Sequence, residues 1–330
     1  MKKTIYIFSD GELKRKQNTL FFENENGKKY VPVENTGEIM IFGEVTINKR
    51  ILEFLTQSEI ILHFFNHYGY YVGSFYPREH LNSGYMILKQ AEHYLNKKKR
   101  IALAIKFVHG AKENIIRVLR FYANRGKSVQ PVLENIETLA ESISTCSDIN
   151  ELMAIEGNVR EQYYGCFDEI LDDKHFVFGG RTRRPPQNRL NALISFGNSI
   201  MYTIALSEIY KTHLDPRIGF LHATNFRRFS LNLDIAEIFK PIVVDRLIFK
   251  LVNKNIIKSQ HFEKRLNGIV LNEKGRELFI REMDERLKTT IKHKSLGRNV
   301  SYRTLIRLEL YKIEKHLMSE GEYEPYVSGW

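Results

Sequence analysis

The spacing of apolar residues changes once along this chain, and this change constrains the fold more than any other feature. The first part consists of short segments rich in β-branched and aromatic residues, separated by turn residues such as Ser9-Asp10-Gly11. Such segments are typical of β-strands. We expect strands over residues 4–8, 18–23, 29–33, 38–47, 60–65 and 70–75, and one short helix over residues 50–57.

Beyond about Ser83 the apolar residues recur at the period of an α-helix. The expected helices cover residues 86–94, 101–108, 129–139, 149–155, 191–213, 242–252, 274–288 and 302–318, and a further helix is headed by Glu156. We therefore predict an α+β protein with a small antiparallel β domain, residues 1–80, and a larger helical domain, residues 81–330. A chain of 330 residues with 43% hydrophobic residues can fill two such cores. The polar tail, residues 319–330, is expected to be disordered.

Positive charge is concentrated in one region of the chain. Residues 240–298 hold 15 basic and 7 acidic residues, a surplus of eight within a whole-chain net charge of +11. A regional basic field of this kind most often meets nucleic acid, although a membrane surface or plain solvation would also explain it. Nucleic acid is therefore the first partner to consider.

The cysteine pattern and the N-terminus indicate a cytoplasmic protein. Cys146 and Cys166 stand twenty positions apart with no CxxC motif, which predicts neither a disulfide framework nor a zinc site. Met1-Lys2-Lys3-Thr4 leads into an alternating segment rather than an apolar signal core. The long apolar segment 191–213 is interrupted by Gly197, Asn198 and Glu208, so we interpret it as a core helix. We expect no membrane association.

One histidine and three acidic residues carry the strongest chemical signal. His222 ends an apolar run, and Asp234 and Glu237 follow it three positions apart, a spacing that places both carboxylates on one helix face. Glu156 lies in a similar setting upstream. Carboxylates held side by side repel each other unless a cation lies between them, so these residues predict a divalent-metal site. The alternatives are a core histidine, a helix-dipole role for Asp234 and a salt bridge from Glu156 to Arg160.

Mixed carboxylate and imidazole ligation suits Mn²⁺ and also Mg²⁺. A cation held in this way can polarise a phosphodiester and activate a water or hydroxyl nucleophile. In a basic protein, this chemistry points to phosphoryl transfer on DNA.

Several residues near these acids are candidates for contacts with DNA, because guanidinium groups match phosphate oxygens and aromatic rings stack on bases. The alternative is that the arginines are only solubilising and that the tyrosines belong to the core. The candidates are Arg160, Tyr164, Arg181, Arg183, Arg184, Asn191, Arg227, Arg228 and Lys240.

Four segments resemble, in order, the signature blocks of the CRISPR-associated Cas1 integrases. They are residues 152–164 around Glu156-Gly157, residues 184–197 ending at Gly197, residues 215–222 ending Gly219-Phe220-Leu221-His222, and residues 231–241 containing Asp234 and Glu237. Segments 18–20, 32–34, 43–45 and 73–77 also resemble that family. Gln187-Asn188-Arg189 departs from the family pattern, in a loop.

The resemblance implies a β-sandwich N-terminal domain that dimerises, an all-α catalytic domain, a homodimer, and Cas2 as a companion protein. It implies a DNA endonuclease and integrase, dependent on Mg²⁺ or Mn²⁺, that inserts DNA fragments called spacers into a CRISPR array. Its implied metal ligands are Glu156, His222 and Glu237, and Asp234 assists them in catalysis. The alternatives are a metal-dependent DNase acting on branched DNA in repair and a non-enzymatic architectural protein that binds DNA.

Overall fold

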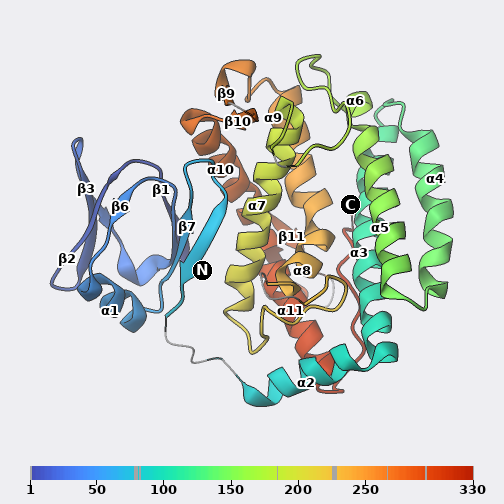
Figure 1. The fold of residues 1–330 in the computed structure, drawn as a ribbon, viewed down its shortest axis with the longest axis horizontal. Helices are drawn as coiled ribbons and strands as arrows, with labels where there is room; N and C mark the ends of the chain where they lie inside the picture. Colours follow the sequence, from blue (N-terminus) through green and yellow to red (C-terminus); the bar gives the residue numbers. More distant parts are fainter. Residues whose placement is uncertain are drawn as a thin grey trace. The chain divides into compact units, whose positions relative to one another are not determined.

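The chain forms two compact units, Met1–His80 and Leu81–Trp330 (Figure 1). The computed structural model describes residues 2–77, 81, 83–183, 185–224, 229–265, 267–293 and 296–329. The predicted order, with β-strands first and a mostly helical region after them, is confirmed.

The first unit contains two four-stranded sheets and one short helix. One sheet has the order β1 (Lys3–Ile7), β5 (Thr36–Ile41), β7 (Ile61–Phe65), β8 (Tyr71–Phe75), and the other has the order β4 (Gly27–Val31), β3 (Thr19–Asn24), β2 (Gly11–Lys16), β6 (Val45–Thr46). Alternate residues of both sheets, such as Leu13, Leu20, Ile39 and Leu62, share one core with helix α1 (Lys49–Gln57). The two sheets therefore form a sandwich.

The antiparallel arrangement predicted for this unit is wrong for three strand pairs. Strands β1 and β5, β5 and β7, and β2 and β6 pair in parallel, whereas β2 with β3, β3 with β4, and β7 with β8 are antiparallel. The reason is that the chain leaves the first sheet after β1 and returns at β5. Alternation of residues reveals which face of a strand is buried, but it does not identify the neighbouring strand.

The second unit is built from helices, which the sequence predicted with shifted boundaries. They are α2 (Gly84–Leu95), α3 (Lys97–Ala123), α4 (Gln130–Glu141), α5 (Ile149–Gly165), α6 (Phe167–Ile170), α7 (Arg189–Ile209), α8 (Leu231–Lys240), α9 (Arg246–Asn253), α10 (Glu273–Lys288) and α11 (Tyr302–Leu317). Two small antiparallel strand pairs, β9 (Phe262–Arg265) with β10 (Gly268–Leu271) and β11 (Thr290–Lys292) with β12 (Asn299–Ser301), correct the prediction of an all-α domain.

Helix α5 also corrects a boundary, because it is continuous where the sequence suggested one helix over 149–155 and another headed by Glu156. Its N-cap, Asp148, accepts hydrogen bonds from the backbone N–H groups of Asn150 and Glu151. Glu156 therefore lies in the middle of a helix, where its backbone N–H and C=O groups take part in the helical hydrogen bonds.

Helices α7 and α8 lie at the centre of the second unit. Helix α7 is long and apolar enough to cross a membrane, but 83% of its most apolar window is buried inside the folded unit, as in a core helix. Its Gly197 permits a close approach, since a Cβ atom there would lie 2.6 Å from Cγ1 of Val244 and 2.9 Å from Cζ of Phe279. Its buried Glu208 is paired with Lys211, Arg303 and Arg307.

The tail is packed on this unit, contrary to the prediction of disorder for residues 319–330. Tyr323 is buried, and its hydroxyl donates to Oε1 of Glu309 at 2.6 Å. The backbone N–H of Ser328 donates to Oδ1 of Asn114 in α3 at 2.9 Å. A Cβ atom at Gly110 would lie 2.6 Å from Cβ of Pro325, so the tail approaches α3 where a glycine leaves room. The polar composition of the tail conceals these few anchoring contacts.

Candidate active site

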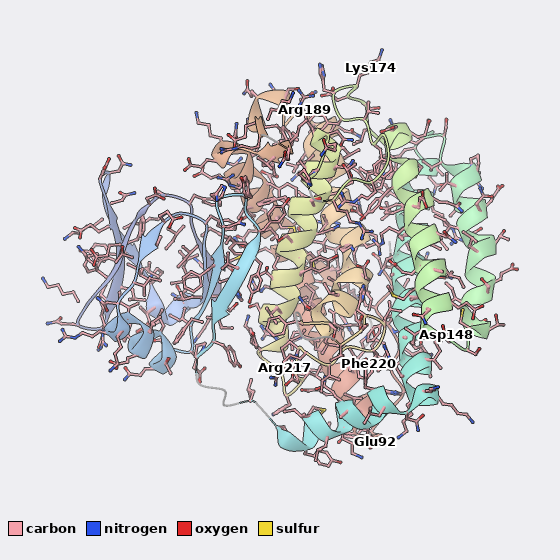
Figure 2. All side chains as sticks on the ribbon, in the orientation of Figure 1. Glu92, Asp148, Lys174, Arg189, Arg217 and Phe220 are labelled. Atoms are coloured by element: carbon pink, nitrogen blue, oxygen red, sulfur yellow. The ribbon has the colours of Figure 1, made fainter. Side chains whose placement is uncertain are left out.

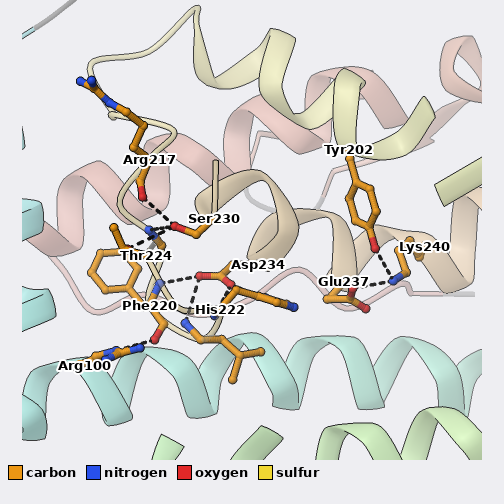
Figure 3. A network of polar contacts seen from close by, with 12 residues as sticks. Arg100, Tyr202, Arg217, Phe220, His222, Thr224, Ser230, Asp234, Glu237 and Lys240 are labelled. Atoms are coloured by element: carbon orange, nitrogen blue, oxygen red, sulfur yellow. Dashed lines mark hydrogen bonds and ion pairs between the residues drawn. The ribbon is translucent and has the colours of Figure 1, made fainter. Parts of the chain in front are cut away.

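The loop between α7 and α8 is folded around the carboxylate of Asp234 (Figure 3). Asp234 is fully buried, and its Oδ2 accepts hydrogen bonds from the backbone N–H groups of Phe220 at 2.6 Å and Leu221 at 3.1 Å. Its Oδ1 accepts from the backbone N–H of His222 at 3.0 Å. At Gly219 a Cβ atom would lie 2.8 Å from this carboxylate and 2.7 Å from the backbone of Ser230. Asp234 thus fixes the loop that carries His222.

The imidazole of His222 is oriented by the same carboxylate. Its Nδ1 lies 2.8 Å from Oδ1 of Asp234, so Nδ1 carries the proton and the lone pair is on Nε2. Nε2 forms no hydrogen bond to a described residue, and the side chain is 23% exposed. Burial lowers the pKa of His222, whereas the hydrogen bond to Asp234 and the charges of Asp234, Glu237 and Glu156 raise it. The raising effects are together larger, so the pKa of His222 lies above its usual value. A histidine held in this way is suited to ligate a metal through Nε2.

Glu237 lies about one turn beyond Asp234 on α8 and is buried. Its Oε1 accepts from Nζ of Lys240 at 2.5 Å, and its Oε2 accepts from Nη2 of Arg160. Burial alone would raise the pKa of this carboxyl, but Arg160, Lys240 and His222 hold it well below its usual range. Glu237 is therefore ionised.

Arg160 joins the carboxylates of two distant helices. Its Nε donates to Oε1 of Glu156 at 3.0 Å along α5, while Nη2 reaches Glu237 on α8. The charges of both glutamates act on His222. The structure therefore links Glu156 on α5 to Glu237 on α8 through Arg160, with His222 near enough to feel both charges. It also contains the salt bridge to Arg160 that was the alternative interpretation of Glu156.

The donor set fits a divalent cation in type and in charge. One imidazole nitrogen and two carboxylates suit Mn²⁺ or Mg²⁺. In this structure Arg160 and Lys240 form ion pairs with the carboxylates of Glu156 and Glu237. Their two positive charges together equal the charge of one divalent cation. Within the described ranges, no three His, Cys, Asp or Glu side chains converge into a ready-made metal site. The donor types match such a cation, while Arg160 occupies both carboxylates in this structure.

Asp245 is a buried acid beside this site that the sequence analysis did not single out. Neither of its oxygens has a hydrogen-bond partner of good geometry among the described residues, and it is fully buried. Burial raises its pKa to about 7, although Arg160, Lys240 and a weak contact with the Tyr163 hydroxyl act in the opposite direction. The available signal was an acid directly after the apolar run Ile242-Val243-Val244.

Some residues predicted to contact DNA are structural instead. Asn191 is fully buried, and its Oδ1 accepts from Nη1 of Arg181 at 2.9 Å while its Nδ2 donates to the carbonyl of Gly180 at 2.8 Å. Arg181 also donates to Ser195 at 3.0 Å. These contacts fix the loop between α6 and α7, and they correct the prediction for Asn191.

Other predicted contacts also lie inside the second unit. Tyr164 is buried in an aromatic cluster with Tyr163 and Phe167, so it cannot stack on a base in this conformation. Arg160 and Lys240 are buried at the carboxylates described above, and Lys240 also donates to the hydroxyl of Tyr202 at 3.2 Å. They can act only on a phosphate that enters the site.

Arg183 is the predicted arginine that the structure leaves exposed. It forms no ion pair with a described residue, and its charge acts on Tyr202, which places it near Lys240. Lys174 and Arg189 lie at the same end of the second unit (Figure 2). The β9–β10 hairpin packs on the loop between α6 and α7, since Nε2 of Gln187 in that loop donates to the carbonyl of Asn267 at 2.9 Å. We call the residues Lys174, Arg183, Arg189, Lys264 and Arg265 the basic end.

Three further candidates, Arg184, Arg227 and Arg228, lie outside the described residues.

Comparison with known proteins gives concordant results. Residues 5–285 match the family model described as CRISPR associated protein Cas1. The chain is 69% identical over 330 residues to "CRISPR-associated endonuclease Cas1 2" of Thermodesulfovibrio yellowstonii, covering 100% of both chains. The solved structure of TM1797, a CAS1 protein from Thermotoga maritima, superposes with a TM-score of 0.88 at 50% identity and covers 98% of this chain and 99% of that one.

Two more distant structures share the fold. A casposase bound to integration product matches with a TM-score of 0.88 over 100% of this chain and 94% of that chain. A chain of a Cas6-RT-Cas1–Cas2 complex matches with a TM-score of 0.85 over 99% of this chain and 36% of that chain. Each is 18% identical, so these likenesses concern the fold alone.

Proposed function

The chain belongs to the family of CRISPR-associated Cas1 proteins, and from this premise we propose that it is a metal-dependent DNA endonuclease and integrase. Its substrate is a DNA fragment with a 3′-hydroxyl, which it joins to the repeat of a CRISPR array. The observation that carries the proposal is the chain of ion pairs from Glu156 through Arg160 to Glu237 and Lys240, which lies near enough to His222 for both carboxylate charges to act on it.

The reaction is a phosphoryl transfer. The oxygen of the attacking 3′-hydroxyl forms a bond to a repeat phosphorus, the bond from phosphorus to the departing 3′ oxygen breaks, and a proton passes from the attacking to the departing oxygen through water. When bound by Glu156, His222 and Glu237, Mg²⁺ or Mn²⁺ supplies charge stabilisation at the phosphate and lowers the pKa of the nucleophile. With water in place of the hydroxyl, the same site cuts DNA.

The chain's own residues prepare this chemistry. Asp234 holds the proton on Nδ1 of His222, which keeps the Nε2 lone pair directed away from the carboxylate. Lys240, held by Tyr202 and Glu237, provides a fixed positive charge beside the site. Positive groups placed before the reaction begins stabilise the charge that develops on the phosphate oxygens.

The basic end is the surface that we propose for the duplex. The charge of Arg183 acts on Tyr202 beside Lys240, and Lys174, Lys264 and Arg265 extend the positive surface over the neighbouring loop and hairpin. Contacts of this kind release counterions, so binding to DNA would weaken steeply with salt.

The cytoplasm is the proposed location, and the proposed partners are a second copy of the chain, bound through the first unit, and Cas2. Cas1 and Cas2 occur together in the name of the fold-related complex.

A strand-transfer assay tests the function. The protein, alone and with Cas2, is incubated with a 3′-hydroxyl donor, a supercoiled plasmid carrying a repeat, and Mn²⁺ or Mg²⁺. We expect joined donor–plasmid product, and its loss when the cation is chelated. Cutting without joined product would favour a DNase of branched DNA, and binding without cutting would favour an architectural protein.

Two substitutions assign the activity to this site. Glu156→Ala and His222→Ala are expected to abolish cutting and joining while the fold survives. Glu161→Ala, at an exposed position of the same helix, is the matched control and is expected to keep both activities. Activity that persists in Glu156→Ala would contradict the proposed site.

A further inference from the structure

A cluster of buried polar atoms that form no hydrogen bond of good geometry lies near the two carboxylates. Among the described residues it contains both side-chain oxygens of Asp245, Nη1 of Arg160 and the hydroxyls of Tyr163 and Tyr164. Asp245 is fully buried, and Arg160 is 9% exposed. Buried polar groups are nearly always hydrogen-bonded, so a cluster left open in this way calls for an explanation.

The members of the cluster come from two elements that face each other. Arg160, Tyr163 and Tyr164 follow one another on α5, while Asp245 ends the short π-helical segment Pro241–Asp245 after α8. The charges of Arg160 and Asp245 act on each other directly, and the guanidinium lies over the ring of Tyr164, 5.9 Å from its centroid. Asp245 is therefore a second buried carboxylate near enough to Arg160 for their charges to interact.

Arg160 is the group that has to move. Its Nε and Nη2 are committed to Glu156 and Glu237, whereas Nη1 has no partner. A divalent cation at the same carboxylates would repel the guanidinium strongly in this buried setting. A buried arginine remains charged, so it needs another anion. Of the buried carboxylates that the structure describes, Asp245 is the one that has no hydrogen bond of good geometry at either oxygen.

We infer that Asp245 is a positioning residue that receives the guanidinium of Arg160 when a divalent cation binds Glu156 and Glu237. In the cation-free state Arg160 holds the two glutamates in place. In the loaded state it pairs with Asp245, so that the site keeps its charge balance without expelling a buried cation to solvent. This inference rests on the proposed metal-dependent function, and it adds a residue that acts through Arg160 and touches neither the cation nor DNA.

The experiment is a double-mutant cycle on Mn²⁺ affinity, measured without DNA by titration calorimetry and by the electron paramagnetic resonance of free Mn²⁺. Asp245→Asn is expected to weaken Mn²⁺ binding about tenfold, because the displaced guanidinium of Arg160 would then have no second carboxylate to pair with. Arg160→Gln is expected to bind Mn²⁺ at least as tightly as the wild type, because it removes the competing cation. In the Arg160→Gln background, Asp245→Asn is expected to have no further effect, and Asp245→Glu is expected to restore binding in part.

Each outcome decides one question. Equal affinity of wild type and Asp245→Asn overturns the inference but leaves the metal-dependent function intact. An equal loss from Asp245→Asn in both backgrounds overturns it too, since a general structural defect does not depend on Arg160. Weaker binding by Arg160→Gln alone overturns it even if Asp245→Asn fails to fold. Absence of Mn²⁺ binding by the wild type overturns the proposed function and the inference together.

Discussion

Replacing Asp234 by asparagine should release the loop that presents His222. The carboxylate accepts two hydrogen bonds at each oxygen, three from backbone N–H groups and one from the imidazole. An amide has one acceptor oxygen and one donor NH₂ group, so in either orientation two N–H donors face another donor. Each buried group left unsatisfied costs about 1–3 kcal/mol, so the expected loss in the free energy of unfolding for two such groups is roughly 2–6 kcal/mol.

Asp234→Asn should also remove the activity, because it changes which nitrogen of His222 carries the proton. With the NH₂ group of asparagine toward His222, the imidazole can accept a hydrogen bond at Nδ1 only if its proton moves to Nε2. The nitrogen that would ligate a cation is then blocked. We expect Asp234→Asn to lose cutting and joining although Glu156 and Glu237 are unchanged.

Urea unfolding and hydrogen exchange measure the two effects. The amides of Phe220, Leu221 and His222 should exchange faster in Asp234→Asn than in the wild type. Asp148→Asn is the matched control, because asparagine caps a helix as well as aspartate does, and its stability should stay close to that of the wild type. If Asp234→Asn unfolds within about 0.5 kcal/mol of the wild type and these amides keep their protection, the anchoring role of Asp234 is wrong.

Three further predictions concern stability, packing and DNA. Burial would raise the pKa of Glu208, but its three basic partners lower it to about 2. A depressed pKa stabilises the folded state at pH values above the unfolded pKa of about 4.3, so the wild type should lose roughly 3 kcal/mol of its free energy of unfolding as the pH falls from about 5 toward 2. Urea unfolding of Glu208→Gln over the same pH range should lack this loss, because glutamine does not titrate. Gly197→Ala should lower the free energy of unfolding by about 1–3 kcal/mol through steric clash, whereas Gly157→Ala, with no atom near its Cβ position, should raise it by about 0.5–1 kcal/mol in thermal or urea unfolding. Arg183→Ala should reduce the slope of log K against log salt for duplex DNA by about one unit, and the exposed Arg281 should give an unchanged slope when replaced by alanine; equal slopes for both variants would contradict the proposed DNA surface.

The sequence by itself determined the order of the two kinds of secondary structure and the family, and it indicated a candidate site. A period of two or of 3.6 residues is set by backbone geometry, so the change near Ser83 was readable without tertiary information. Residue type and local spacing also predicted a cation site at Glu156, His222, Asp234 and Glu237, because acids and histidines in apolar settings are rare without a reason. The order of the signature blocks then identified the family, which the comparisons confirm.

The tertiary structure alone decided which distant groups meet. The parallel pairing of β1 with β5, the bridge from Arg160 to Glu237, 77 positions away, and the anchoring of the tail on Glu309 all join segments that carry no local mark of each other. The role of Asp234 depended on backbone N–H groups of a loop, which a sequence of side chains does not display. The burial of the Asp245 carboxylate without a hydrogen bond of good geometry could likewise be recognised only from the tertiary structure, because burial depends on the residues that pack around a side chain.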